Sequence, residues 1–223
     1  MTHGIKTLAL AAMVLLGSSA AMAQSAGTWM VKGGVNRIEP HVTSGNLSAP
    51  SLPNSQVDVK ADTAAILTGA YMLTDAFSLE FYAGLPYEHE IVGAGSLAGV
   101  GKLGTVKQVS PTLFAQYRFL EASSAWRPYV GAGLTYAYFY GEEGSGTLTA
   151  LTNPGGPPTQ MSVDSAFGFS SQLGLTVRVA DRWYLDGSVV KTFLKNKTTL
   201  STGQSIDTKL DPVSVNLSVG YMF

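Results

Sequence analysis

The chain has 223 residues and a formal net charge of −1, so it lacks the basic surplus typical of nucleic-acid binders and of proteins that bind acidic membrane surfaces. Charged residues make up only 13% of the chain, which is about half the share of an ordinary soluble domain, while glycine is abundant. The absence of cysteine excludes disulfides and thiolate chemistry. This composition predicts strands that turn one face away from water.

The first 23 residues have the pattern of a signal peptide. Lys6 provides the positive start, Leu8–Leu16 an apolar run, and Ala21–Ala23 a small-x-small cleavage site. The apolar run is too short to cross a bilayer as a helix, which takes about 20 residues. We expect cleavage after Ala23 and an exported domain over residues 24–223; a retained membrane anchor is the alternative.

Alternating apolar and polar residues predict eight strands in the exported domain. The strands cover Thr28–Arg37, Ala61–Leu73, Phe77–His89, Val109–Leu120, Trp126–Tyr140, Val163–Val179, Trp183–Lys195 and Lys209–Phe223. Three connections are short and four are long, the long ones being residues 39–60, 90–108, 141–162 and 196–208. Short turns at one end and long loops at the other are typical of outer-membrane barrels. The predicted fold is therefore all-β, an eight-stranded antiparallel transmembrane β-barrel of the up-and-down type, with both termini in the periplasm.

Aromatic residues mark one end of the predicted strands. Across the stretch expected to face the membrane, their parity along each upward strand carries no charge except Lys191 near the outer edge, whereas the other parity carries most polar residues. Indole and phenol rings favour the membrane interface because one edge is apolar and the other stays hydrated. We therefore expect an interface ring facing outer-membrane lipid and lipopolysaccharide, formed by Trp29, Phe77, Trp126, Trp183, Tyr221 and Phe223. Burial of these rings in a soluble core is the alternative.

The inward parity predicts two zones inside the barrel. The lower zone is a polar plug of mutually paired side chains, Lys32, Glu80, Gln116, Arg118, Arg178 and Asp186. The upper zone is an apolar lining formed by Ile66, Pro86, Phe114, Phe139 and Val190. An eight-stranded barrel is filled by its side chains or holds one small ligand, and buried charges need partners. We expect the plug to stop water and ions and the lining to accept a small hydrophobic guest; a proton or ion path through the plug is the alternative.

Pro86 and Pro111 fall at similar heights on neighbouring predicted strands. Neither residue can donate a ladder hydrogen bond. These two prolines are candidates for a lateral gate through which a guest leaves the barrel wall. The alternative is that both lie above the membrane and only bend the rim.

The exported domain has two histidines, His41 and His89, and the stretch "YEHE" around His89 raises the question of a metal or acid–base site. A third ligand or a nucleophile at a fixed spacing is missing from the pattern. We expect both histidines to be solvated residues at loop bases, and the protein to have no catalytic site, metal or cofactor.

Several stretches resemble the OmpW family of outer-membrane proteins, in order along nearly all of the exported domain. They include "AYMLTDAFSLEFYAGLPYEHEI", "SPTLFAQYRF", "WRPYVGAGLTY" and the terminal "LDPVSVNLSVGYMF". The resemblance implies a Gram-negative outer-membrane barrel that passes small hydrophobic molecules, and a terminal Phe223 read by the barrel-assembly machinery. The "NPGGPP" stretch at residues 153–158 departs from the family because it cannot continue a helical cap over the barrel mouth. A surface receptor or adhesion barrel with an inert lumen, contacting phage, bacteriocin or host surfaces, is the alternative function, and the sequence indicates no oligomeric state.

Overall fold

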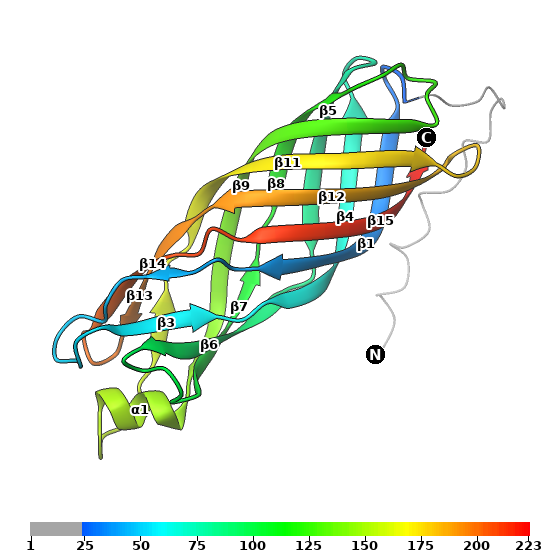
Figure 1. The fold of residues 1–223 in the computed structure, drawn as a ribbon. Helices are drawn as coiled ribbons and strands as arrows, with labels where there is room; N and C mark the ends of the chain where they lie inside the picture. Colours follow the sequence, from blue (N-terminus) through cyan, green and yellow to red (C-terminus); the bar gives the residue numbers. More distant parts are fainter. Residues whose placement is uncertain (1–23) are drawn as a thin grey trace, which may run out of the picture.

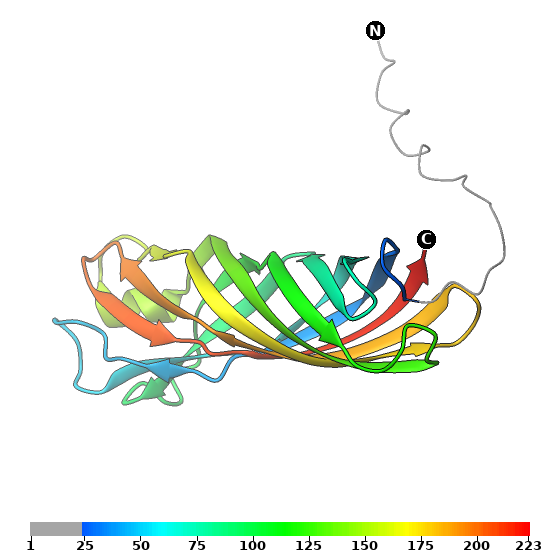
Figure 2. The ribbon, with the colours of Figure 1, turned by 90° about the horizontal axis from the view of Figure 1, so that it is seen from above.

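In the computed structural model, residues 24–223 are described, and the predicted signal peptide at 1–23 lies outside the described residues. Eight long antiparallel strands form a closed barrel, which confirms the predicted fold class (Figures 1 and 2). The strands are β1 (Trp29–Glu39), β4 (Asp62–Met72), β5 (Phe77–Gly84), β8 (Thr112–Arg118), β9 (Trp126–Gly144), β11 (Ala166–Arg178), β12 (Trp183–Phe193) and β15 (Val213–Met222). Because β11 pairs with both β12 and β9, the barrel has no free edge.

Side chains alternate between lumen and exterior along every barrel strand, with the predicted parity. On β5, for example, Phe77, Leu79 and Phe81 are exposed, whereas Ser78, Glu80 and Tyr82 are buried. A water-soluble protein would bury the first set. The exterior is instead an apolar surface around the whole barrel, as lipid tails require.

The predicted interface aromatics lie on this exterior at the end of the barrel that carries the short turns. All six are exposed or half-buried: Trp29, Phe77, Trp126, Trp183, Tyr221 and Phe223. Neighbouring rings pack against one another, with Trp183 and Phe223 both lying 5.0 Å from Tyr221 between ring centroids. The amide of Phe223 donates to the carbonyl of Trp29, so the last residue is tied to the first barrel strand.

The sequence predicted loops for the four long connections, and this prediction is wrong. The connections carry further strands and a helix that extend the barrel outward (Figure 1). The strands are β2 (Thr43–Ser44), β3 (Ser55–Val59), β6 (Tyr87–Gly95), β7 (Lys102–Val109), β10 (Met161–Val163), β13 (Lys195–Leu200) and β14 (Ser205–Lys209). β3, β6 and β7 continue the barrel sheet along β9, while β10, β13, β14 and β2 form a second sheet. Their inward apolar side chains build a separate core around Leu103, Phe139 and Leu200. The glycines and prolines of these segments indicated loops. Burial of the shared core nevertheless stabilises them as strands.

Helix α1 (Gly146–Thr152) lies in the third connection, directly before the "NPGGPP" stretch that was expected to prevent a continuous helical cap. The hydroxyl of Ser145 caps it by accepting a hydrogen bond from the Leu148 amide at 3.1 Å. The helix ends at Asn153, where "NPGGPP" begins, so the prolines limit its length rather than prevent it. Within residues 24–223, no helix is long and apolar enough to cross a membrane.

Candidate functional site in the barrel interior

A buried ion network fills the lower half of the barrel. Lys32 Nζ lies 2.6 Å from Glu80 Oε1 and 3.0 Å from Asp186 Oδ1. Neutral side chains donate further hydrogen bonds to the two carboxylates, namely Thr68, Gln116, Tyr129 and Thr176. Every carboxylate oxygen is therefore satisfied, which is the condition for keeping charges away from water.

Arg118 supplies the second cation of this network. Its guanidinium donates to Ser78 at 3.1 Å, Gln116 at 2.9 Å and Thr176 at 3.1 Å, and lies 4.8 Å from the ring centroid of Tyr129. Lys32 and Arg118 thus balance Glu80 and Asp186. We call the set of Lys32, Glu80, Gln116, Arg118 and Asp186, which the sequence placed in one plug, the floor network.

Arg127 closes the barrel beneath the floor network and was missed by the sequence reasoning. It is fully buried and donates to five main-chain carbonyls. Those carbonyls belong to Gln24, Asp75, Arg118, Phe119 and Leu120. Arg127 follows the outward-facing Trp126, so alternation along the strand places it in the lumen. This parity could have predicted its burial from the sequence.

Arg178 does not belong to the floor network, contrary to the prediction. It is half-buried, and its Nη2 donates to the carbonyl of Ser123 in a short turn at 3.2 Å. The residue is the last one of β11, so its long side chain lies at the rim of the lumen, between this turn and the buried Tyr184, and does not reach the floor network.

A small cavity of about 60 Å³ lies above the floor network. Ile66, Phe114 and Val190 line it, as the sequence placed them, and pack with Tyr82 in one apolar cluster. Gly133 makes room for this packing, because a Cβ there would lie 2.6 Å from the Phe114 ring. Pro86 is not part of the lining; it is exposed because the inward parity shifts by one residue between Tyr82 on β5 and Tyr87 on β6.

The wall beside the small cavity has an interrupted ladder. Pairing of β5 with β8 ends at Tyr82–Thr112, and pairing of β6 with β7 begins at Tyr87–Gln108. Residues 83–86 and 109–111, which contain Pro86 and Pro111, have no register with each other. Each side is held by its other neighbour: Leu85 donates to Ala65 at 2.9 Å, and Tyr136 donates to the Pro111 carbonyl at 3.0 Å. Residues 83–85 and 110 also line the small cavity, so we call the segments 83–86 and 109–111, which do not pair with each other, the wall gap.

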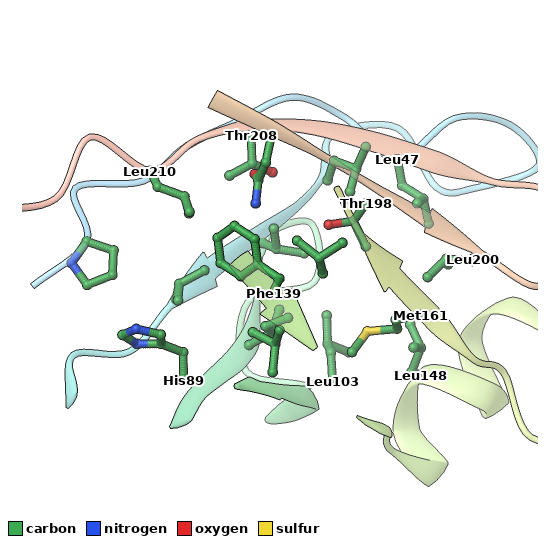
Figure 3. A pocket seen from close by; sticks show the side chains of 18 of the residues that line it. Leu47, His89, Leu103, Phe139, Leu148, Met161, Thr198, Leu200, Thr208 and Leu210 are labelled. Carbon is green, nitrogen blue, oxygen red and sulfur yellow. The ribbon is translucent and has the colours of Figure 1, made fainter. Parts of the chain in front are cut away.

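A second cavity of about 120 Å³ lies within the outer extension (Figure 3). Its lining is mostly aliphatic and includes Leu103, Leu148, Met161, Leu200 and the predicted lining residue Phe139. Four residues line both cavities, which are therefore adjacent: Ile38, Gln108, Leu194 and Pro212. The interior is thus a polar floor, a small cavity of mixed polar and apolar lining above it, and an apolar cavity in the outer extension.

His89 is buried, which corrects the expectation that it is solvated. Only 2% of its surface is exposed, it lines the second cavity, and its Nδ1 lies 2.8 Å from the Lys60 carbonyl. The outer extension that covers it was not foreseen from the sequence. His41 is exposed, and no group of three or more metal-ligating residues occurs within residues 24–223.

An exterior of apolar side chains, a ring of interface aromatics and a closed antiparallel sheet define an outer-membrane β-barrel protein. The chain belongs to the OmpW family, whose model matches residues 25–223. Outer membrane protein W of Vibrio cholerae serotype O1 is 32% identical over 220 residues, covering 96% of this chain and 97% of that protein. Outer membrane protein AlkL of Ectopseudomonas oleovorans is 24% identical over 181 residues, covering 80% of this chain and 74% of that protein. The protein is accordingly located in the outer membrane of a Gram-negative bacterium.

Solved structures agree with this assignment. The crystal structure of OprG from Pseudomonas aeruginosa superposes with a TM-score of 0.81 at 25% identity, covering 91% of this chain and 98% of that one. AlkL in DMPC lipid bilayers superposes with a TM-score of 0.68 at 21% identity, covering 95% of this chain and 97% of that one. The second likeness concerns the fold alone.

Proposed function

We propose that this protein is a passive, non-enzymatic conduit that takes up small hydrophobic molecules and releases them sideways through the wall gap. The observation that carries the proposal is the adjacency of an apolar outer cavity and a smaller, partly polar inner cavity that reaches the wall gap. The floor network and Arg127 block the straight route to the periplasm. A guest that enters from outside therefore has its apolar exit in the lipid beside β5 and β8.

The height of the wall gap is compatible with release into the membrane. Residues 83–86 lie six to nine positions above the interface residue Phe77. At about 3.3 Å per residue and a tilt of about 40°, this is roughly 15–23 Å above the level of the interface aromatics, within the outer part of a ~25 Å apolar band. Unpaired backbone at that depth is costly in lipid unless something covers it. A passing apolar guest and the exposed Leu85 side chain can both provide such cover.

Reconstitution tests this function directly. The protein is placed in vesicles whose outer leaflet contains lipopolysaccharide, the layer that hinders apolar molecules. Uptake of the apolar dye N-phenyl-1-naphthylamine is then compared with ion conductance in a planar bilayer of the same lipids. We expect faster dye uptake than in empty vesicles and little ion current. Steady ion current without faster uptake would contradict the proposal and indicate a water-filled pore.

A further inference from the structure

His89 occupies the junction between the two cavities. It lines the outer cavity, whereas Tyr87, two residues before it on β6, lines the inner one. Gln108, which pairs with Tyr87, lines both. Figure 3 shows His89 at one end of the outer cavity, with Phe139 in the middle and Leu148 and Met161 at the end next to α1. A guest moving from the outer cavity to the wall gap therefore passes the imidazole.

The hydrogen bond to Lys60 fixes the role of each ring nitrogen. Because a carbonyl only accepts, Nδ1 carries the hydrogen that is donated to the Lys60 oxygen at 2.8 Å. In the neutral ring, Nε2 then holds a lone pair. This Nε2 is buried and has no hydrogen-bond partner among residues 24–223.

The surroundings keep the ring neutral. Burial is the largest effect and lowers the pKa of His89, while the Lys60 carbonyl and the carboxylate of Asp62 act in the opposite direction. The Tyr87 ring stacks on the imidazole with centroids 6.0 Å apart and brings no charge. No lysine or arginine is among the described residues that line the outer cavity.

A buried acceptor without a partner costs free energy that a donor on a guest would recover. We infer that His89 is a specificity-determining residue whose Nε2 accepts a hydrogen bond from a hydroxyl or N–H group on an otherwise apolar guest. This inference rests on the proposed function and narrows its substrates to alcohols, phenols and similar molecules with one donor. Hydrocarbons of equal size lack the bond, and carboxylates would bring an unpaired charge into an apolar space.

The inner cavity continues the same chemistry. Asn36 and Asn216 face each other across β1 and β15, both line that cavity, and the Oδ1 atom of each is buried without a partner. When the hydroxyl or N–H group of a guest leaves His89, it can therefore donate to these two asparagine oxygens close to the wall gap. Unpartnered acceptors along the path favour a guest with one donor over a guest with none.

The inference is tested with 2-naphthol and 2-methylnaphthalene. These probes have nearly the same shape, but the first has a hydroxyl group where the second has a methyl group. Binding to the protein in lipid nanodiscs is measured at pH 7.5 against empty nanodiscs. We expect the wild type to prefer naphthol beyond the lipid's own preference. His89→Phe should weaken naphthol binding about three- to tenfold, the value of one net hydrogen bond, and leave methylnaphthalene within about twofold.

Two further variants separate hydrogen bonding from packing. His41→Phe makes the same replacement at an exposed histidine that lines neither cavity, and should leave both affinities unchanged. His89→Gln retains a donor for Lys60 and an acceptor for the guest, and should keep the preference for naphthol. Equal weakening of both probes in His89→Phe, or an unchanged preference, would overturn the inference while leaving the proposed conduit intact. Failure of the wild type to bind either probe would overturn both.

Discussion

Lys32 is the residue on which the closed floor depends most, because it lies between two buried carboxylates. Replacing it by methionine keeps the length of the side chain but leaves Glu80 and Asp186 without their ion-pair partner. Removing one partner of a buried pair costs about 3–5 kcal/mol. We expect Lys32→Met to lower the free energy of unfolding by that amount in urea titrations of protein folded in lipid vesicles.

A control and a rescue accompany this measurement. Lys209→Met, on the exposed face of β14, should change the free energy of unfolding by less than about 0.5 kcal/mol. Adding Glu80→Gln and Asp186→Asn to Lys32→Met removes the unpaired charges and should recover most of the loss. If Lys32→Met and Lys209→Met are equally stable, the floor network does not stabilise the barrel.

His89 makes the outer extension sensitive to acid. Its pKa is lower in the folded protein than the ordinary value of about 6.5, so between these two values the folded state binds fewer protons than the unfolded state. Its contribution to stability is therefore complete above about pH 6.5 and is lost as the pH falls below it. We expect hydrogen exchange in β6 and β7, corrected for the intrinsic pH effect, to become faster on acidification. His89→Phe should lack this change; an identical pH response in the variant would assign it to another group.

Parity along a strand predicted which residues face the lumen but not how far each side chain reaches. Lys32, Glu80 and Asp186 meet because the shear of the barrel brings β1, β5 and β12 together, and the sequence does not contain that register. Arg178 has the same parity yet bonds to a turn, while Arg127 was overlooked although it is buried. The sequence thus indicated a polar floor, and the pairings required the structure.

At the scale of elements, the prolines separate barrel from extension. The two strands predicted through 77–89 and 109–120 are each divided, with β5 ending at Gly84 and β8 beginning at Thr112. The prolines were recognised in the sequence as positions without a donor, so the interruption had a local signal. The sheets of the extension had none, because β3 pairs with β6, and β2 with β14, through contacts between distant segments of the chain.

Restoring donors at the wall gap should impede lateral release. Pro86→Val together with Pro111→Val adds two amide hydrogens where residues 83–86 and 109–111 have no register with each other. Two net hydrogen bonds of about 0.5–1.5 kcal/mol each should reduce dye uptake at least about fivefold. The measurement is the vesicle assay with N-phenyl-1-naphthylamine.

Pro128→Val provides the matched control, since Pro128 lies in β9 near the short turns and far from the wall gap along the strand. That variant should take up dye at the wild-type rate. Near-ultraviolet circular dichroism of all variants checks that the barrel is folded. Unchanged uptake in the double variant would mean that Pro86 and Pro111 only bend the rim.

Considered as a whole, the molecule has three zones along its length. The ring of interface aromatics surrounds the end with the floor network, the apolar barrel exterior follows, and the outer extension has its own core. The extension is a water-exposed structure, since its outward residues are polar, such as Lys195, Lys197 and Asp207. The barrel below it exposes leucine, valine and phenylalanine instead. The same kind of exposed side chain is therefore in lipid on one part of the chain and in water on the other.

Leu217 and Leu52 make this difference measurable, because the two residues are equally exposed, each with 60% of its surface accessible. Leu217 lies on β15, four residues above Tyr221, or about 10 Å above the aromatic ring and near the middle of the apolar band. Leu52 lies between β2 and β3 in the outer extension, at the edge of the outer cavity and with most of its surface in solvent. In water, arginine at either position would have little effect.

We expect Leu217→Arg to lower the free energy of unfolding in lipid vesicles by about 2–4 kcal/mol, the cost of arginine near the bilayer midplane. Leu52→Arg should change it by less than about 0.5 kcal/mol, as a substitution on a hydrated surface does. Equal effects at the two positions would mean that solvent and not lipid contacts the outside of β15, and lateral release through the wall gap would then have no apolar phase to receive the guest. A large effect at Leu217 alone is the outcome expected with lipid around the barrel, because solvent exposure and side-chain type are matched between the two positions.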